Sequence, residues 1–300
     1  MIERAALVAL LRRPGVSWTE TALSIQENGS ASALLDRIVA SPETLFPDAI
    51  PAAELISAAA HEITGWSAEG IGVHAFFDDT YPAQLLGIRE MPPLLFSRGD
   101  LQVHDRAVAV VGSRRASEQG LRIARAVATT LAERGVTVAS GLAKGIDTAA
   151  HTAALDAGGR TVAVIGTGIR RYYPAANRQL QDQIAEVGLV ISQFWPDAQP
   201  TKQSFPMRNA VMSGYAVATV VVEAGETSGA RIQARLALQH GRPVVLTSQV
   251  MRCDWAKTFA ENPGVYVVHG TVELLEAIED ILSHQPTEAG LENFPDLALR

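Results

Sequence analysis

The sequence lacks paired cysteines, and it lacks any long apolar run. Cys253 is the only cysteine among 300 residues, so no internal disulfide can form and a reducing, cytoplasmic setting is expected. Met1 is followed by Ile2 and Glu3, without the basic flank and apolar stretch of a signal peptide. No apolar run approaches the roughly 20 residues that cross a bilayer, so we expect no membrane partner.

Sequence motifs of catalysis and of metal binding are also missing. The chain has no P-loop, no G-x-G-x-x-G dinucleotide fingerprint, no paired metal-ligand spacing and no serine nucleophile elbow. The residues around Cys253 match no nucleophile motif, so a small packed side chain is expected there. The sequence therefore predicts a protein that is not an enzyme, with no catalytic residues, no metal and no cofactor.

Charge is unevenly distributed along an acidic chain. The formal net charge is −7, and the segment from Glu273 to Arg300 holds seven acidic residues against one basic residue. Between Ala107 and Arg178 the balance reverses, with ten Lys or Arg against four Asp or Glu. A phosphate responds to charges within a Debye length of about 8 Å, so the basic middle segment is expected to attract an anionic ligand.

The order of the predicted elements indicates a small helical module followed by an α/β domain. Residues 1–65 are predicted as short helices, and residues 66–106 as an extended connector rich in turns. Residues 107–284 alternate apolar, β-branched runs with helices, and residues 285–300 form an acidic tail. This alternation is typical of an extended Rossmann-like, doubly wound parallel sheet with helices on both faces.

The individual elements are predicted as follows. Helices are expected at 5–12, 18–27, 31–40, 51–61, 117–134, 145–155, 176–187, around Asn209, and at 230–240 and 271–284. Strands are expected at 107–111, 136–139, 161–165, 189–192, 217–222, 243–246 and 264–268.

The first predicted strand of the α/β domain ends in Gly112, Ser113, Arg114 and Arg115. Open α/β sheets bind ligands at the carboxyl ends of their strands, where the next helix also directs free N–H groups. A glycine allows close approach of the backbone, and the guanidinium fork of Arg114 suits a phosphate. Arg115, taken alone, is equally consistent with a surface residue without a role.

The loop after the second strand contains Gly141 and Lys144, which indicate a backbone nest for an anion. Asp147 lies at the start of the following helix, where a carboxylate favours the helix dipole. His151 follows one turn later on the same face, so a structural hydrogen bond between the two is predicted. An acid–base pair is the alternative.

The loop after the third strand pairs glycines with cations and rings, through Gly166, Gly168, Arg170, Arg171 and Tyr173. Proteins that bind single strands use cations to follow phosphates and rings to stack on bases, at about 1–3 kcal/mol per base. Tyr173 also fits a packed turn aromatic.

Two further loops carry similar residues. Phe205, Arg208 and Asn209 open a helix, and Ser228 and Gly229 precede another after the fifth strand. With the earlier loops, they predict a binding site for single-stranded nucleic acid along one edge of the sheet.

Together these loops resemble the DNA-processing protein A (DprA/Smf) family. The matching runs are 111–114, 140–147, 150–151, 158–161, 166–168, 173–174 with Asn177, 205–209, 222–224 and 228–229. Residues 81–95 resemble the family's entry segment, and residues 7–29 resemble its helical N-terminal module. The resemblance covers about residues 1–250 and rests on several motifs in the same order.

The resemblance implies an extended Rossmann-like domain with a sterile-alpha-motif-like module at residues 1–65. It also implies binding of incoming single-stranded DNA in natural transformation, a homodimer, and help in loading a RecA-type recombinase. Arg114 would be a strand-binding arginine, and Lys144 and Arg208 would line the same pocket.

The chain departs from the family pattern at several positions. Ala210 stands where a second arginine is usual, Gln193 where a glutamate is usual, and Ala175 where a basic residue is frequent. Residues 228–234 differ from the usual Ser-Gly-Ser-Leu-x-Thr-Ala, and Thr247-Ser248-Gln249 replaces a Pro-Gly loop. Only a predicted helix and a tail follow Val268, so we expect a divergent member without a C-terminal winged helix.

Two other functions fit parts of the sequence. A nucleotide-derivative sensor or hydrolase on the same fold is suggested by Asp147, His151 and Glu223. A partner-binding scaffold is suggested by the acidic tail.

Overall fold

In the part of the chain that the structure describes, four helices precede the sheet. The structure is a computed structural model, and it describes residues 1–40 and 50–284. The helices are α1 (Ile2–Arg12), α2 (Trp18–Asn28), α3 (Ala31–Ala40) and α4 (Ala52–Ala68). Ser17 caps α2 by accepting a hydrogen bond from the Glu20 amide at 3.3 Å, and Gly29, with φ of 75°, ends it. The predicted glycine break between the second and third helices is confirmed.

Nine strands form one sheet, in which six of the eight neighbouring pairs are parallel. The strands are β1 (Gly72–Ala75), β2 (Leu94–Gly99), β3 (Ala107–Gly112), β4 (Thr137–Ser140), β5 (Thr161–Val164), β6 (Leu189–Ser192), β7 (Ala218–Glu223), β8 (Val244–Thr247) and β9 (Val265–Val268). Their order is β1-β2-β6-β5-β4-β3-β7-β8-β9, and β1 and β2 are antiparallel to their neighbours. The predicted doubly wound, mainly parallel sheet is therefore confirmed.

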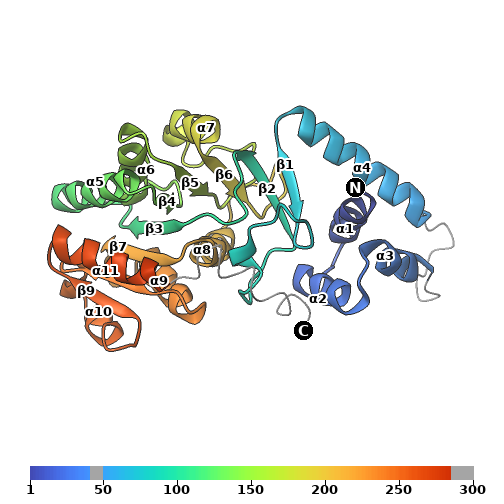
Figure 1. Cartoon of the computed structure of the whole chain (residues 1–300). Helices are drawn as coiled ribbons and strands as arrows, with labels where there is room; N and C mark the ends of the chain where they lie inside the picture. Colours follow the sequence, from blue (N-terminus) through green and yellow to red (C-terminus); the bar gives the residue numbers. More distant parts are fainter. Residues whose placement is uncertain (41–49, 285–300) are drawn as a thin grey trace.

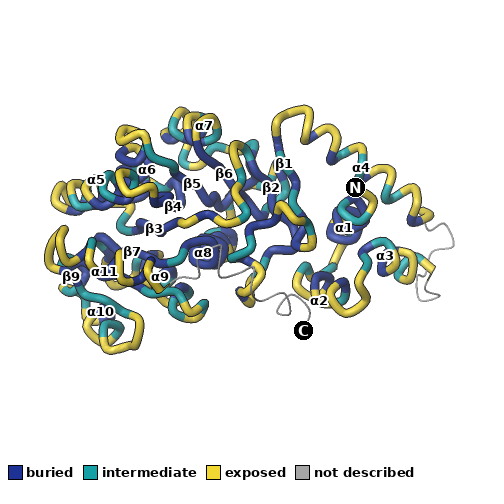
Figure 2. The backbone as a smooth tube through the Cα atoms, viewed as in Figure 1, coloured by how far each residue is buried: buried dark blue, intermediate teal, exposed yellow. Residues whose placement is uncertain are grey.

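Helices cover both faces of this sheet. They are α5 (Glu118–Glu133), α6 (Ile146–Asp156), α7 (Arg178–Val187), α8 (Ser204–Tyr215), α9 (Gly229–Gln239), α10 (Asp254–Phe259) and α11 (Thr271–Ser283), with short 3-10 turns at Ala83–Leu85, Ala175–Asn177 and Val250–Arg252. Val108 and Val110 of β3 pack with α5, α6 and α11, whereas Ala107 and Ala109 belong to the core that contains α8 and α9. Because successive side chains of a strand point to opposite faces, this run of apolar residues fills both cores. Figure 2 shows α8 and the central strands as buried and much of the outer helices α4, α5 and α7 as exposed.

The helical module lies at one end of the molecule, beside β1 and β2, and α10 and β9 lie at the other end (Figure 1). Aromatic side chains join the module to the sheet. The rings of Trp18 and Trp195 meet edge to face with centroids 5.3 Å apart, and so do those of Trp66 and Phe96. The guanidinium of Arg12 lies 3.9 Å from the ring centroid of Trp195.

The segment predicted as an extended connector, residues 66–106, differs from the prediction because it contains β1 and β2. β2 pairs with both β1 and β6, so this segment extends the sheet rather than leading into it. α4 also continues seven residues beyond the predicted end at His61. The predicted acidic tail, 285–300, lies outside the described residues, and the domain boundaries stay a prediction. Within the described ranges, no helix combines the length and apolarity needed to span a membrane.

Candidate functional site

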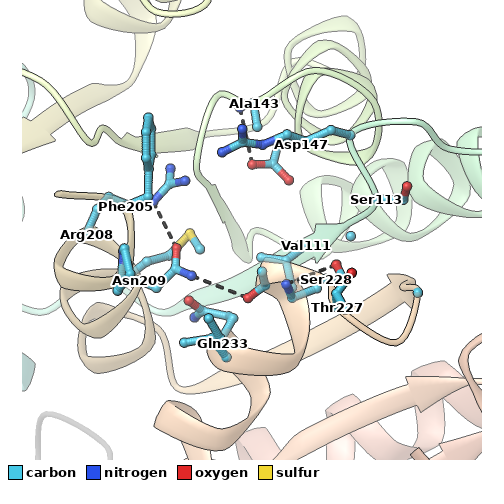
Figure 3. A pocket seen from close by; sticks show the side chains of 18 of the residues that line it. Val111, Ser113, Ala143, Asp147, Phe205, Arg208, Asn209, Thr227, Ser228 and Gln233 are labelled. Atoms are coloured by element: carbon cyan, nitrogen blue, oxygen red, sulfur yellow. Dashed lines mark hydrogen bonds between the residues drawn. The ribbon is translucent and has the colours of Figure 1, made fainter. Parts of the chain in front are cut away.

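The strand order reverses direction at β3. From β3 the chain winds outward through β4, β5 and β6 on one side, and β7, β8 and β9 lie on the other. In open α/β sheets such a reversal leaves a crevice at the carboxyl ends of the two central strands. A cavity of about 480 Å³ lies there, which we call the switch-point pocket (Figure 3). Its lining includes Gly112–Arg115 at the end of β3, Ala143 and Asp147 near the start of α6, four residues of α8 (Phe205, Pro206, Arg208 and Asn209), and Thr227–Ala230 after β7.

Two loops of the site pack backbone against backbone. Gly145 has a φ of 80°, and a Cβ there would lie 3.0 Å from the carbonyl carbon and oxygen of Arg114. At Gly112 the pairing of β3 with β7 shifts register, and a Cβ would lie 2.8 Å from the Glu223 carbonyl oxygen. Glycine is therefore required at both positions, and it sets the loop that carries Arg114 directly beside the loop that carries Lys144.

A cation and two rings form a platform at the mouth of the pocket. The guanidinium carbon of Arg114 lies 5.1 Å from the centroid of the Phe205 ring, which is within cation–π range. The centroid of the Phe205 ring lies 5.5 Å from that of Tyr173, a residue that is 43% exposed. A Cβ on Gly166 would lie 2.8 Å from the Phe205 ring, so the absence of a side chain there lets the ring lie close to the backbone. The platform offers a positive charge and an accessible π surface side by side.

Arg208 is buried under the pocket rather than extended from it. Its Nη1 donates to the carbonyl oxygens of Gly141 and Val164, the latter at 2.8 Å, and its Nε donates to Asn209 Oδ1 at 3.0 Å. Burial lowers the pKa of Arg208, and the negative charge of Asp147 opposes this shift. The backbone carbonyls therefore hold a positive charge beneath the pocket.

Asp147 and His151 are not hydrogen-bonded to each other, so the predicted pair is wrong. Asp147 Oδ2 accepts from the amides of Gly141 and Ala143, both at 3.2 Å, because its carboxylate turns back to the loop at the helix start. The Nδ1 of His151 is hydrogen-bonded to Thr161 Oγ1 at 2.7 Å. Burial raises the pKa of Asp147, with Arg208 and the two amides partly offsetting it, and burial lowers the pKa of His151 to about 3.

Glu223, the third acid–base candidate, anchors the start of α5. Its carboxylate accepts from the amide of Ser117 at 3.1 and 3.2 Å and from the Ser117 hydroxyl at 2.5 Å. Asp147, His151 and Glu223 therefore have separate hydrogen-bond partners and do not form one catalytic group. Among the residues that the structure describes, no three His, Cys, Asp or Glu side chains cluster to hold a metal ion.

Most of the residues predicted for the site lie around the pocket. Nine line it: Gly112, Ser113, Arg114, Arg115, Phe205, Arg208, Asn209, Ser228 and Gly229. Gly141 lies against the guanidinium of Arg208 and Gly166 against the ring of Phe205. Lys144 is exposed beside Gly145 and is not among the lining residues.

Tyr173 of the platform and three other predicted residues lie outside the pocket lining. Gly168 packs against the loop after β6, with its amide 2.9 Å from the Ala198 carbonyl oxygen. Arg170 forms ion pairs with Glu69 and Asp197, both at 2.6 Å, and so connects the end of α4 to the sheet domain. Arg171 donates to the carbonyl oxygen of Asp197 at 3.2 Å. The structure gives these arginines intramolecular partners.

Sequence reasoning missed one buried polar residue of the pocket. Gln233 of α9 is 1% exposed and lines the pocket between alanines that face the sheet (Figure 3). A glutamine on the apolar side of a helix, next to Ala230, Ala234 and Ala237, was the available signal.

Fold and pocket together define a class: a Rossmann-type α/β protein with a cleft at the reversal of its strand order. Comparison with known proteins makes this specific. The sequence model of the family described as DNA recombination-mediator protein A matches residues 72–283, and the chain belongs to this family.

Individual relatives agree with that assignment. The chain is 46% identical over 171 residues to the DNA processing protein DprA of Streptococcus pneumoniae, which covers 57% of this chain and 60% of the relative. It is 38% identical over 218 residues to the protein Smf of Escherichia coli, covering 72% of this chain and 56% of the relative. The chain thus spans little more than half the length of these curated relatives.

Solved structures show the same fold. The X-ray structure of DprA from Streptococcus pneumoniae matches with a TM-score of 0.73 and 33% identity, over 91% of this chain and 97% of that one. A structure of DNA processing protein A from Helicobacter pylori, whose description concerns the single-stranded DNA binding mode of that protein, matches with a TM-score of 0.62. At 24% identity, over 71% of this chain and 96% of that one, this second likeness bears on the fold alone.

Proposed function

We propose that this protein binds single-stranded DNA at the switch-point pocket, without chemical conversion of the strand. The observation that carries the proposal is the Arg114 guanidinium 5.1 Å from the Phe205 ring, at the mouth of a pocket bordered by glycine turns. A cation beside an accessible ring is the arrangement that binds the phosphate and the base of an unpaired nucleotide. A duplex presents its bases already stacked and would not use the ring.

The start of α9 adds a place for a phosphate. Ser228 caps this helix by accepting from the Ala230 amide at 3.2 Å, and Thr227, Ser228 and Gly229 line the pocket. Free amides and the helix dipole favour an anion at such a helix start. Arg114 approaches the same cavity from β3. A phosphate between the two loops would be bound from both sides.

Family membership extends the proposal from binding to cellular role. A DNA recombination-mediator family, with relatives named DNA processing proteins, supports a role in DNA processing during natural transformation. In this role the protein would protect incoming strands and help load a RecA-type recombinase, acting as a homodimer in the cytoplasm.

A nucleotide-derivative sensor or hydrolase is the second candidate function. It is favoured by one observation, the buried carboxyl group of Asp147 in the lining of the pocket, whose pKa is raised by burial. Against hydrolysis, the Asp147 carboxylate accepts two loop amides, and His151 and Glu223 have other partners.

A salt-resolved titration tests the proposal. Binding of the full chain to labelled dT20 and to a labelled duplex of the same length would be measured by fluorescence anisotropy from 50 to 300 mM salt. A panel of mononucleotides would be tested separately in a thermal-shift assay. We expect tighter binding of dT20 than of the duplex, and a logarithmic salt slope of about −0.7 for each phosphate contacted. Salt-independent binding, or a large stabilisation by one mononucleotide with no oligonucleotide binding, contradicts the proposal.

A further inference from the structure

A second cavity lies on the same edge of the sheet as the switch-point pocket. It has a volume of about 730 Å³ and lies at the carboxyl end of β6, between the helical module and the sheet. We call it the junction groove and define it by Trp18, Met91, Pro92, Gln193, Trp195 and Met207. It is built jointly by α2, by the segment before β2, by the loop after β6 and by α8.

The two cavities are separated by the first turn of α8. Pro206 lines the switch-point pocket and Met207, the next residue, lines the junction groove. Four strand spacings separate β7 from β6 in the order β7-β3-β4-β5-β6. At about 4.8 Å per spacing this edge spans roughly 19 Å. At the 3.4 Å per nucleotide of a stacked strand this is roughly six nucleotides, and fewer when the strand is extended.

The lining of the groove suits flat, partly polar rings. Trp18 and Trp195 pack edge to face with centroids 5.3 Å apart, and both remain partly exposed. Met207 is 51% exposed and presents a polarisable thioether beside them. Gln193 is 8% exposed, and in the described part of the chain its side-chain amide nitrogen has no hydrogen-bond partner. Turning that amide toward the cavity would give it a partner on the edge of a bound base.

Charge at the rim of the groove is compatible with a polyanion. Arg89 is exposed, lines the groove and has no ion-pair partner among the described residues. The neighbouring Glu90 is already engaged, with its Oε2 2.8 Å from His240 Nε2. The rim therefore offers one cation without an ion pair, beside the hydrogen-bonded carboxylate of Glu90, which also lines the groove.

We propose that the junction groove is a second base-binding subsite for the same strand, which continues from the switch-point pocket across Phe205 and Met207. This inference rests on the proposed function. It gives the helical module a direct part in binding, because Trp18 stacks on a base that the sheet domain alone cannot reach. It also makes affinity depend on the length of the strand.

Anisotropy titrations of dT4 and dT16 with matched variants test this. Met207→Glu places a charge in the groove, and Leu86→Glu is its control, since Leu86 is 50% exposed and lines neither cavity. We expect Met207→Glu to weaken dT16 binding at least about fivefold, the loss of one stacked base, with dT4 affinity within twofold of wild type. Leu86→Glu should change neither. Equal affinity of both variants for dT16 overturns the inference while leaving the proposed function intact, whereas absence of any oligonucleotide binding overturns both.

Cross-linking supplies a second readout. Full-length protein would be irradiated with dT16 that carries 5-iododeoxyuridine at one end or the other, and the linked peptides identified by mass spectrometry. Adducts on the peptides of Trp18 or Trp195 from one of the two probes support the second subsite. Adducts confined to peptides that line the switch-point pocket, from both probes, overturn it.

Discussion

Replacing Gly141 by alanine is expected to destabilise the protein through Arg208. An added Cβ would lie within 3 Å of three guanidinium atoms, among them Nη2 at 2.7 Å. The guanidinium would have to leave the carbonyls of Gly141 and Val164, to which its Nη1 donates. Arg208 is 5% exposed, so water cannot replace those acceptors.

The size of the effect follows from these two hydrogen bonds. Each bond to a charged group is worth about 1.5–3 kcal/mol. Alanine recovers about 0.4–1 kcal/mol by restricting the unfolded chain, because Gly141 does not have a positive φ. With partial relaxation we expect a net loss of about 2–4 kcal/mol, which at about 2–4 °C per kcal/mol lowers the melting temperature by roughly 5–15 °C.

The assay is thermal and urea unfolding of a double-mutant cycle with Arg208→Met. In the Arg208→Met background the added methyl group meets no guanidinium, so Gly141→Ala should cost less than about 0.5 kcal/mol. Gly225→Ala is the matched control, because a Cβ there meets nothing within 4 Å in the same pocket. An equal cost of Gly141→Ala in both backgrounds, or no cost in wild type, would refute the reasoning.

Three further predictions follow from the contacts described above. Arg114→Ala should weaken dT20 binding about tenfold and reduce the magnitude of the salt slope by about 0.7, whereas Arg125→Ala, an exposed arginine of α5, should leave both unchanged. Arg170→Ala should lower the free energy of unfolding by less than about 1 kcal/mol, as expected for exposed ion pairs, and its affinity for dT20 should stay within twofold of that of the wild type. A tenfold loss of affinity would instead show that Arg170 contacts the DNA. Because burial lowers the pKa of His151 from 6.5 to about 3, the unfolded state takes up the proton first as pH falls. From pH 7 to 4.5 this group should remove roughly 2–3 kcal/mol of stability, so urea titrations should give a shallower acid slope for His151→Leu than for the wild type, and equal slopes would contradict this.

The strands at the centre of the sheet could be predicted because they carry a simple signal. β3 is apolar along its length and carries three valines because both of its faces are covered, and such runs are distinct from amphipathic helices. β1 and β2 lack this signal. They pair antiparallel at one end of the sheet, β1 as the edge strand with four residues and β2 directly after the turn-forming Pro92 and Pro93. The pairing of β2 with β6 is a long-range contact that local pattern does not encode.

The edge on which the site lies was predictable, but the partners of its cations were not. The carboxyl ends of parallel strands share one edge, so glycine turns after β3, β4 and β7 had to meet. Arg170 looked as available as Arg114, yet Glu69, 101 residues earlier in the chain, pairs with it. Arg208 is buried because Gly141 and Val164 present carbonyl oxygens to it, a geometry that exists only once the loops are packed.

The aromatic contact between the helical module and the sheet provides the protein with an internal optical probe. Three of its four tryptophans, Trp18, Trp66 and Trp195, meet where the module rests on the loop after β6. Any separation of the module from the sheet would expose these indoles to water together and shift their emission to longer wavelength. Detachment of the module could therefore be timed in a stopped-flow instrument without attaching a dye.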